Sequence, residues 1–484
     1  MEELLRSLAD LPRPGERIYL VGGCVRDLLL GRPTKDLDLV TDGNPRRLAE
    51  RIARRTGGAP FCLHREMRAY RVVPRSGAPG IPVDVLPLTE PLEEDLLRRD
   101  FSINAMALPL QHDQMYYSII HYRIMCSTCR LIDPAGGLDD LSAGRVRHVR
   151  PDVFTADPIR LLRAVRMAAV LGFTIVPETE ALARSQAGLL AGAAAERVRD
   201  ELFLLLGAPG CPESVRRLDE MGMLGVILPE LMPLKGLEQN ANHHLDAWEH
   251  TLEVVRQTER LLVGEELPED VFEPAHRALS QPITPPRARR ELFLFAALLH
   301  DVAKPQTRDV TPGGVITFRG HDEAGAAVAA GICRRLRLGG RETKAVARMV
   351  AGHLSPGWLS LEEPLDPRQR YRFFREAGDS AVETLILSLA DRLAARGPWA
   401  APEQIERHRR FVVEMLRLHF EGAPVARPVV PADGRELMRA TGLKPGRELG
   451  ELLEALEEAV AVGEVRSREE AIAFAERWVG ERRS

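Results

Sequence analysis

Residues 21–40 read VGGCVRDLLLGRPTKDLDLV, and this stretch decides how the first part of the chain folds. The apolar run IYLV leads into the glycine pair Gly22 and Gly23, which predicts a strand that ends in a tight turn. The helical pattern VRDLLLG follows and ends at Gly31, and the alternating DLDLV predicts another strand. Such a strand, glycine turn and helix place backbone N–H groups where a phosphate can bind.

Two carboxylates stand out in the predicted strand DLDLV. Asp36 and Asp38 are two residues apart, so both are expected on one face of the strand. Neighbouring carboxylates repel each other unless a cation lies between them, and Mg²⁺ is the usual hard cation for such a pair. We therefore predict a triphosphate and Mg²⁺ site that includes Arg26 and Asp27 on the helix. Asp84, in the alternating IPVDVLPL, is a candidate third carboxylate, and a solvated strand residue explains it equally well.

The composition is that of a soluble globular protein, with 45% hydrophobic and 28% charged residues among 484. This length favours about three domains. No apolar run approaches the roughly 18 residues of a membrane span, and the N-terminus has no apolar signal region, so we expect a cytoplasmic protein without membrane contact. The six scattered cysteines predict no disulfide framework. Because the net charge is −4, any nucleic acid must be held by local basic patches.

The secondary-structure pattern changes near residue 150. Short apolar runs and turn signals fill the first 140 residues, whereas the periodicity is helical from Asp152 onward. Proline-rich interruptions occur at residues 282–290 and in GAPVARPVVPADG, and the apolar run Leu292 to Leu299 has the length of a buried helix. The predicted fold class is α+β, with a small mixed sheet and its helices followed by an all-α body.

The pattern G-G-x-V-R-D-x-x-L-G-R-x-x-x-D-x-D resembles the signature of the class II tRNA nucleotidyltransferases (CCA-adding enzymes) and of the related bacterial poly(A) polymerases. These families belong to the DNA polymerase beta superfamily. The resemblance continues through EEDLLRRDFSINAMAL, where it implies that Arg99, Asp100 and Asn104 contact the ribose and phosphates of the incoming nucleotide. The spacing of four would let one helix face present both Asp100 and Asn104.

The segment ADPIRLLRAVRMAAVLGF resembles the base-selecting helix of the same family. The resemblance implies that Asp157 and Arg160, three apart on one helix face, pair with the edge of the nucleotide base in place of a template. Arg163 and Arg166 continue the row, either toward phosphates or as an ordinary solvated face.

Three features depart from the family pattern. The base-selecting motif usually begins Glu-Asp, but here it begins with Ala156. The segment between the third-carboxylate strand and RRD is short, which in the family is associated with enzymes that add only CC. Residues 112–130, HDQMYYSIIHYRIMCSTCR, replace a short turn. Their Cys126 and Cys129 could be half a zinc site or a redox pair, although an accidental origin is favoured.

A second constellation lies in the helical body. HHLDAWEHTLEVV, ALLHDVAKP and LADRLA contain the ordered set His250, His300, Asp301 and Asp391, which suits a divalent transition metal of unknown identity. The set resembles the HD-domain phosphohydrolases, and His321 and His353 match the extra histidines of their dinuclear members. The resemblance implies phosphatase or 2′,3′-cyclic phosphodiesterase activity on RNA ends. The alternative is a degenerate HD fold that only supports tRNA.

The combined prediction is an enzyme that adds CMP and AMP from CTP and ATP to the tRNA 3′ end, as full CCA or as CC, by two-metal phosphoryl transfer. The alternatives are a poly(A) polymerase and an HD phosphohydrolase whose head binds RNA. A non-catalytic RNA-binding module is disfavoured by the two aspartates. The expected domains are a nucleotidyltransferase head (1–142), a helical neck (143–235), an HD domain (236–400) and a helical tail (401–484).

Overall fold

A computed structural model describes residues 2–75, 80–110, 131–285, 287–362, 365–423, 425–426 and 428–483. The chain forms two compact units. Unit 1 contains Met1–Ala193 and Met221–Met223, and unit 2 contains Ala194–Glu220 and Leu224–Ser484. Cys126 and Cys129 lie outside the described residues. Every helix in the described part is too short or too polar to span a bilayer.

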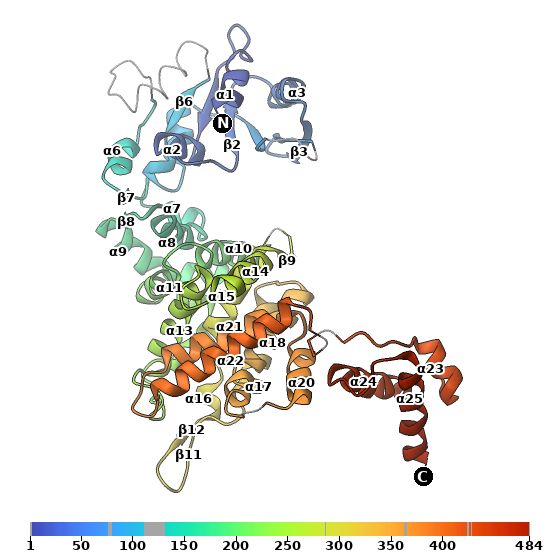
Figure 1. The fold of residues 1–484 in the computed structure, drawn as a ribbon. Helices are drawn as coiled ribbons and strands as arrows, with labels where there is room; N and C mark the ends of the chain where they lie inside the picture. The colour runs from blue at the N-terminus through green and yellow to red at the C-terminus, as the bar shows by residue number, and fades with distance from the viewer. Residues whose placement is uncertain are drawn as a thin grey trace. The chain divides into compact units, whose positions relative to one another are not determined.

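Unit 1 is built on a six-stranded mixed sheet with the order β3-β4-β5-β2-β1-β6 (Figure 1). Strand β2 pairs in parallel with β5, and the other neighbours are antiparallel. Helix α3 packs on β4 and β5 through its apolar face. The predicted small mixed sheet is thus confirmed. The strands are β1 (Ile18–Val21), β2 (Leu37–Thr41), β3 (Ala59–His64), β4 (Ala69–Val73), β5 (Val83–Pro87) and β6 (Ala107–Pro109), and α3 is Pro45–Thr56.

The predicted glycine turn joins β1 to helix α2 (Gly23–Leu29). Gly22 has a φ of 82°, a conformation that L side chains rarely adopt. A Cβ at Gly22 would also lie 2.6 Å from Nη1 of Arg99 and 3.4 Å from Oδ2 of Asp38. Only glycine therefore lets the chain reverse here while two charged side chains approach its backbone.

The remaining helices of unit 1 correct two predictions. Asp100 and Asn104 do not share an α-helical face, because α4 ends at Leu97 and the extended Phe101 leads into a short 3₁₀ turn. Asp157 also lies outside the base-selecting helix, which begins at Arg160. The reason is local: Asp157 precedes a proline, and the residue before proline is disfavoured in the α region. The elements are α4 (Leu92–Leu97), η1 (Ser102–Asn104), α6 (Gly137–Ser142), β7 (Arg145–Val146), α7 (Val153–Ala156), α8 (Arg160–Leu171), β8 (Thr174–Ile175), α9 (Pro177–Gln186) and η2 (Ala187–Gly192), with α1 (Glu2–Ala9) at the start.

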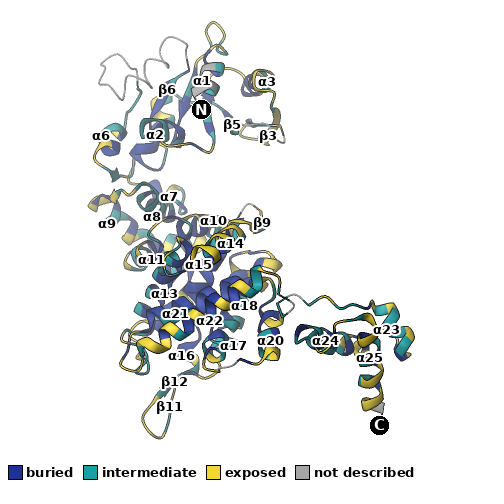
Figure 2. Ribbon diagram, viewed as in Figure 1, coloured by how far each residue is buried: buried dark blue, intermediate teal, exposed yellow. Residues whose placement is uncertain are grey.

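Unit 2 is helical, apart from two small hairpins among its described residues. Its centre is formed by α13, α15 and α21, which are dark blue in Figure 2. Residues 292–299 of α15 are buried throughout, as their apolar run predicts. The elements are α10 (Ala195–Leu206), α11 (Cys211–Glu220), α12 (Leu224–Ile227), η3 (Pro229–Leu234), α13 (Ala247–Leu262), α14 (Glu269–Ser280), β9 (Pro282–Thr284), β10 (Arg287–Ala288), α15 (Arg289–Leu299), α16 (Lys304–Thr307), β11 (Asp309–Val310), β12 (Ile316–Thr317), α17 (His321–Arg335), α18 (Gly340–Gly352), α19 (Ser355–Leu359), α20 (Pro367–Ala377), η4 (Gly378–Ser380), α21 (Ala381–Ala394) and α22 (Pro402–Phe420).

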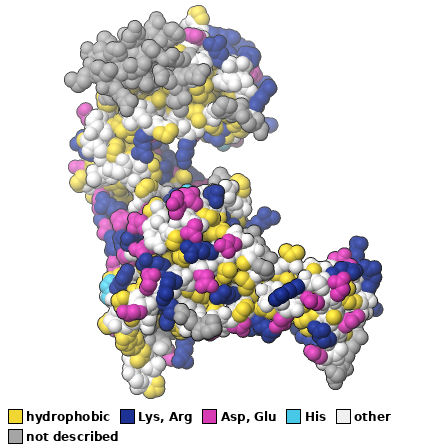
Figure 3. Space-filling model, in the orientation of Figure 1, with side chains coloured by type: hydrophobic (Ala, Val, Ile, Leu, Met, Phe, Trp, Pro, Cys, Tyr) yellow, Lys and Arg dark blue, Asp and Glu magenta, His cyan; other side chains and the backbone are white. Residues whose placement is uncertain are grey.

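Helices α23 (Gly434–Thr441), α24 (Arg447–Ala461) and α25 (Arg468–Arg483) complete the chain. They share an apolar cluster of their own, in which Leu437, Leu452 and Leu456 are fully buried. On the face drawn in Figure 3, basic and acidic side chains are interspersed over unit 2, as expected for a chain with a small net charge.

Candidate functional site

The parallel pairing of β2 and β5 brings the candidate carboxylates together. Asp38 lies directly opposite Asp84 in the register, and Asp36 immediately precedes β2. Asp84 is only 8% exposed and accepts bonds from Nε and Nη2 of Arg71 at 2.6 and 2.7 Å. The reading of Asp84 as a solvated strand residue is therefore wrong, because its carboxylate is buried and paired.

The electrostatics around Asp38 suit a cation. Burial, with the charges of Asp36 and Asp84, raises the pKa of the Asp38 carboxyl to about 6, although Arg99 and Arg71 oppose this shift. A divalent ion would remove the repulsion among these carboxylates, so the residues fit a metal. In the described part of the chain, groups of three possible ligand atoms within 4.8 Å of one another occur only in unit 2. The carboxylates of Asp36, Asp38 and Asp84 would therefore have to move closer together to bind one ion.

A buried network connects several of the predicted nucleotide-binding residues. Nη1 of Arg26 donates to Asn104 at 2.8 Å, and Nδ2 of Asn104 donates to Asp100 at 2.9 Å. Nη1 of Arg163 donates to Asp100 at 3.1 Å. Burial opposes ionisation of Asp100, but Arg163 and the bond from Asn104 outweigh it and hold the pKa of this carboxyl below its usual range. Arg26 also pairs with Asp27 at 2.8 Å. These side chains therefore brace α2, η1 and α8 against one another.

A cavity of about 420 Å³ lies beside this network and is rich in guanidinium groups. Arg160 reaches it from the start of α8 and donates to the backbone oxygen of Arg98 at 3.0 Å. Asp157 and Arg166 are half-buried and do not line it. Sequence reasoning missed Arg150 and Asp152, although the Arg-Pro-Asp run just before the base-selecting motif could have indicated them. The lining is Leu97, Arg98, Arg99, Arg150, Asp152, Val153, Ala156 and Arg160.

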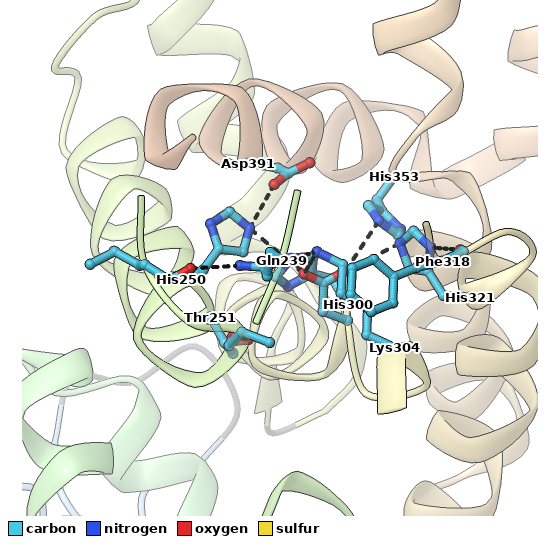
Figure 4. A network of polar contacts seen from close by, with 12 residues as sticks. Gln239, His250, Thr251, His300, Lys304, Phe318, His321, His353 and Asp391 are labelled. Atoms are coloured by element: carbon cyan, nitrogen blue, oxygen red, sulfur yellow. Dashed lines mark hydrogen bonds and ion pairs between the residues drawn. The ribbon is translucent and has the colours of Figure 1, made fainter. Parts of the chain in front are cut away.

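All six predicted metal ligands of unit 2 converge. Figure 4 labels His250, His300, His321, His353 and Asp391. Oδ2 of Asp301 lies 3.0 Å from Nε2 of His300 and 3.7 Å from Nε2 of His250. Oδ1 of Asp301 lies 3.2 Å from Nε2 of His321 and 4.0 Å from Nε2 of His353. Asp301 is thus common to two groups of three ligands. The sixth residue, Asp391, contacts Nε2 of His250 at 2.9 Å.

The orientation of the histidines is set by the backbone. In His300, His321 and His353 the Nδ1 atom contacts the carbonyl oxygen three residues earlier, at 2.8, 2.6 and 2.6 Å. Each Nε2 is buried, and within the described part of the chain none forms a hydrogen bond of good geometry, although the Asp301 carboxylate lies close to all three. Burial, with the neighbouring His300 and His321, lowers the pKa of His353 to about 4, so this ring is neutral and able to ligate. Buried Nε2 atoms that are oriented toward one shared carboxylate fit a divalent metal.

Three further residues at this cluster were not predicted. The Lys304 ammonium lies 2.6 Å from Oδ2 of Asp301 and donates to Oε1 of Gln239 at 2.6 Å. The His243 ring lies 4.4 Å from that of His250. Lys304, three residues after Asp301 in the same motif, was visible in the sequence, whereas Gln239 and His243 were brought there only by the fold.

Comparisons with known proteins agree with this arrangement. The family "Poly A polymerase head domain" matches residues 18–147, and the "HD domain" family matches residues 247–396. Between and after them, "Probable RNA and SrmB-binding site of polymerase A" matches 172–235 and "tRNA nucleotidyltransferase domain 2 putative" matches 430–475. Fold and site thus define a nucleotidyltransferase whose polymerase-type head is joined to a helical body with an HD domain.

Full-length relatives narrow this class. The A-adding tRNA nucleotidyltransferase of Deinococcus radiodurans is 37% identical over 99% of both chains. The CC-adding enzyme of Thermus thermophilus is 36% identical over 96% of this chain and 94% of its own. The fold is similar to that of the Thermotoga maritima CCA-adding enzyme solved with tRNA, with a TM-score of 0.60 at 20% identity, covering 99% and 95% of the two chains. The chain belongs to the tRNA nucleotidyltransferase family.

Proposed function

We propose that the chain adds CMP or AMP, from CTP or ATP, to the 3′ end of tRNA without a template. The observation that carries this proposal is the register of Asp38 with Asp84 beside the Gly22 turn, next to a cavity lined by four arginines. The names of the full-length relatives supply the substrate. A tRNA substrate also favours a cytoplasmic location.

In this mechanism the chain binds, orients and neutralises the reactants. Gly22 leaves room for a triphosphate next to Asp38, and Arg99 and Arg150 neutralise its charge. Asp157 and Arg160 read the base edge, while the backbone at Gly23 and the side chain of Arg166 contact phosphates. Mg²⁺ ions held by Asp36 and Asp38, with Asp84 as a further ligand, would activate the tRNA 3′-hydroxyl and stabilise the departing pyrophosphate.

Among the relatives found by sequence, the extent of the match favours a partial specificity. The A-adding and CC-adding enzymes match over 96–99% of this chain, whereas several multifunctional CCA proteins match over only 66% of it. We therefore propose that the enzyme adds either CC or the terminal A. The short segment after Asp84, which the family resemblance associates with addition of CC only, supports the first of these two alternatives.

Nucleotide addition to three labelled tRNA transcripts, ending before CCA, after C and after CC, tests the proposal. Each is incubated with Mg²⁺ and CTP, ATP or both, and the products are sequenced. Arrest at CC, or extension of only the CC transcript by one A, is expected. Complete CCA would refute partial specificity, long A tracts would indicate a poly(A) polymerase, and no extension would refute the proposed function.

Asp301 belongs to both groups of possible metal ligands in unit 2, and this arrangement favours a second, hydrolytic function. We propose that unit 2 is a metal-dependent phosphohydrolase acting on phosphorylated RNA ends, with His250, His300 and Asp391 on one side of Asp301 and His321 and His353 on the other. Metal analysis of purified protein, with hydrolysis by wild type and His300→Ala, tests it. Absence of bound metal together with no effect of His300→Ala would refute it and leave a domain that only supports tRNA.

The four-part division of the chain remains our proposal for how these functions are distributed. The head (1–142) holds the carboxylates, the neck (143–235) the base-selecting helix, residues 236–400 the HD site, and the tail (401–484) contacts tRNA. Limited proteolysis that yields fragments ending near residues 142, 235 and 400 is the expected result.

A further inference from the structure

A cavity of about 570 Å³ opens from the metal cluster of unit 2, and its walls hold residues that the proposed hydrolysis does not use. One end carries four of the cluster residues, Asp301, His321, His353 and Asp391. The other lining residues include Trp358 of α19, Arg392 of α21, and Arg319, which precedes α17. A volume of this size accommodates a single nucleotide.

Trp358 is an unusual lining residue because 67% of it is exposed to solvent. No described aromatic ring stacks on its indole, and its neighbour Leu361 is 50% exposed. The exposed indole, with Leu361 beside it, offers a flat apolar surface at the wall of a charged cavity, and a planar ligand that covers this surface would remove apolar area from water. Nucleobases stack on such side chains with little dependence on their identity.

The two arginines supply the complementary half of a ligand site. Neither Arg319 nor Arg392 forms an ion pair with a carboxylate in the described part of the chain. Of the three acids in the lining, Asp301 contacts Lys304 and Asp391 contacts His250, and the third, Asp322, forms no ion pair with either arginine in the described part of the chain. Guanidinium groups without a carboxylate partner beside a metal cluster are suited to phosphate oxygens.

Hydrogen bonds of Ser360 and His408 fix the position of the segment that bears Trp358. Oγ of Ser360 donates to the Gly357 oxygen at 2.8 Å. The buried His408 ring contacts Ser360 through Nδ1 at 3.1 Å and Ser388 of α21 through Nε2 at 3.3 Å. Helix α19 is therefore connected to the helix that carries Asp391 and Arg392. His408 acts as a positioning residue for the Trp358 side of the cavity.

We propose that this cavity is a nucleotide-binding site, in which the base stacks on Trp358 and a phosphate of the same nucleotide contacts Arg319, Arg392 and the metal cluster. The phosphate end rests on the proposed hydrolase function, whereas stacking on Trp358 does not. The ligand class is a nucleoside phosphate, supplied either as a free nucleotide or as the last residue of an RNA.

Titration calorimetry of the full chain with Mn²⁺ tests the site, using adenosine 3′-monophosphate and glycerol 2-phosphate as probes. Trp358→Ala is expected to weaken adenosine 3′-monophosphate binding roughly tenfold, within the range for loss of one stacked base, and to leave glycerol 2-phosphate binding unchanged. Trp358→Phe is expected to retain most of the affinity. The matched control is Trp399→Ala, which removes an indole that is 53% exposed and does not line the cavity.

Hydrolysis of the same two probes separates the two proposals. Unchanged adenosine 3′-monophosphate affinity in Trp358→Ala, with hydrolysis intact, would overturn the stacking site and leave the hydrolase. Loss of affinity in Trp358→Ala without hydrolysis by the wild type would refute the hydrolase and support the binding site. If a short RNA with a 3′-phosphate binds more tightly than the mononucleotide, the ligand is an RNA end. If the mononucleotide binds more tightly, the ligand is a free nucleotide.

Discussion

Asp38 is a residue whose surroundings favour an additional positive charge. Asp38→Asn is expected to lower nucleotide addition at least about a thousandfold, because the pair with Asp36 that would hold metal is lost. The protein without metal should become more stable by up to about 2 kcal/mol at pH 8, since a carboxyl with its pKa raised to about 6 is costly to ionise there. Single-turnover addition assays and chemical denaturation with EDTA measure the two effects.

The control for this change is Asp42→Asn, one residue beyond the end of β2. Asp42 forms an exposed ion pair with Arg17 at 2.7 Å and should affect neither activity nor stability by much. An active Asp38→Asn enzyme would contradict the assignment of this carboxylate.

His408 makes stability depend on pH in a defined direction. Burial, with the charge of Arg392, lowers its pKa from 6.5 to about 4. Since the folded state disfavours the proton, the full contribution is present above pH 6.5 and is lost as pH falls toward 4. We expect about 3 kcal/mol to be lost across this window, and His408→Gln to remove most of that dependence. Denaturation midpoints of wild type and His408→Gln, measured from about pH 7 to about pH 4, test this prediction. If stability falls with pH at the same slope in both proteins, the prediction is wrong.

At the level of elements, the network around Asp100 joins α2, η1 and α8. Arg163→Ala leaves a buried carboxylate without its main charged partner, so the free energy of unfolding should fall by about 3 kcal/mol. Asp100→Asn introduced into Arg163→Ala should recover part of this loss, because the unpaired charge is gone. Urea denaturation of the single and double variants measures it.

An exposed arginine provides the comparison for that series. Arg46 on α3 pairs with Glu50 at 3.1 Å, and its side chain is 70% exposed, so Arg46→Ala should change stability by less than about 0.5 kcal/mol. An equal effect of the two substitutions would show that the network does not brace these elements.

At the level of the whole molecule, the two sites lie in different compact units, so metal removal should act on one of them selectively. Chelation is expected to lower the melting temperature of unit 2, because buried histidines lose a ligand that binds only the folded state. His300→Ala should already melt at the lower temperature and should be insensitive to chelator. With Mg²⁺ in excess over the chelator, so that the carboxylates of the head keep their ion, unit 1 should be unaffected in both proteins. Differential scanning calorimetry with and without EDTA measures this, and a uniform shift of both transitions would contradict it.

The same separation applies to activity. His300→Ala should abolish hydrolysis of phosphorylated RNA ends and leave nucleotide addition unchanged, whereas Asp38→Asn should do the reverse. Assays of both activities on both variants test the independence of the sites. Loss of both activities in either variant would show that one site depends on the other.

The sequence alone predicted the features that depend on short-range order. Gly22, the aspartates of DLDLV and the buried run of α15 follow from local periodicity and turn chemistry, and the spacing of His300 and Asp301 within one motif indicated a metal ligand pair. The α-helical placement of Asn104 and Asp157 was wrong. Phe101 is extended by its sheet-like pairing with His148, and Asp157 is restricted by the proline that follows.

Only the tertiary structure decided which distant residues meet. The parallel pairing of β2 with β5 placed Asp84 opposite Asp38, and no local pattern specifies which strands become neighbours. The arginines of the head cavity and the cavity wall formed by Trp358 and Arg392 come from separate segments for the same reason. Local sequence sets dihedral preferences and side-chain faces, whereas long-range packing determines which of those faces share a site.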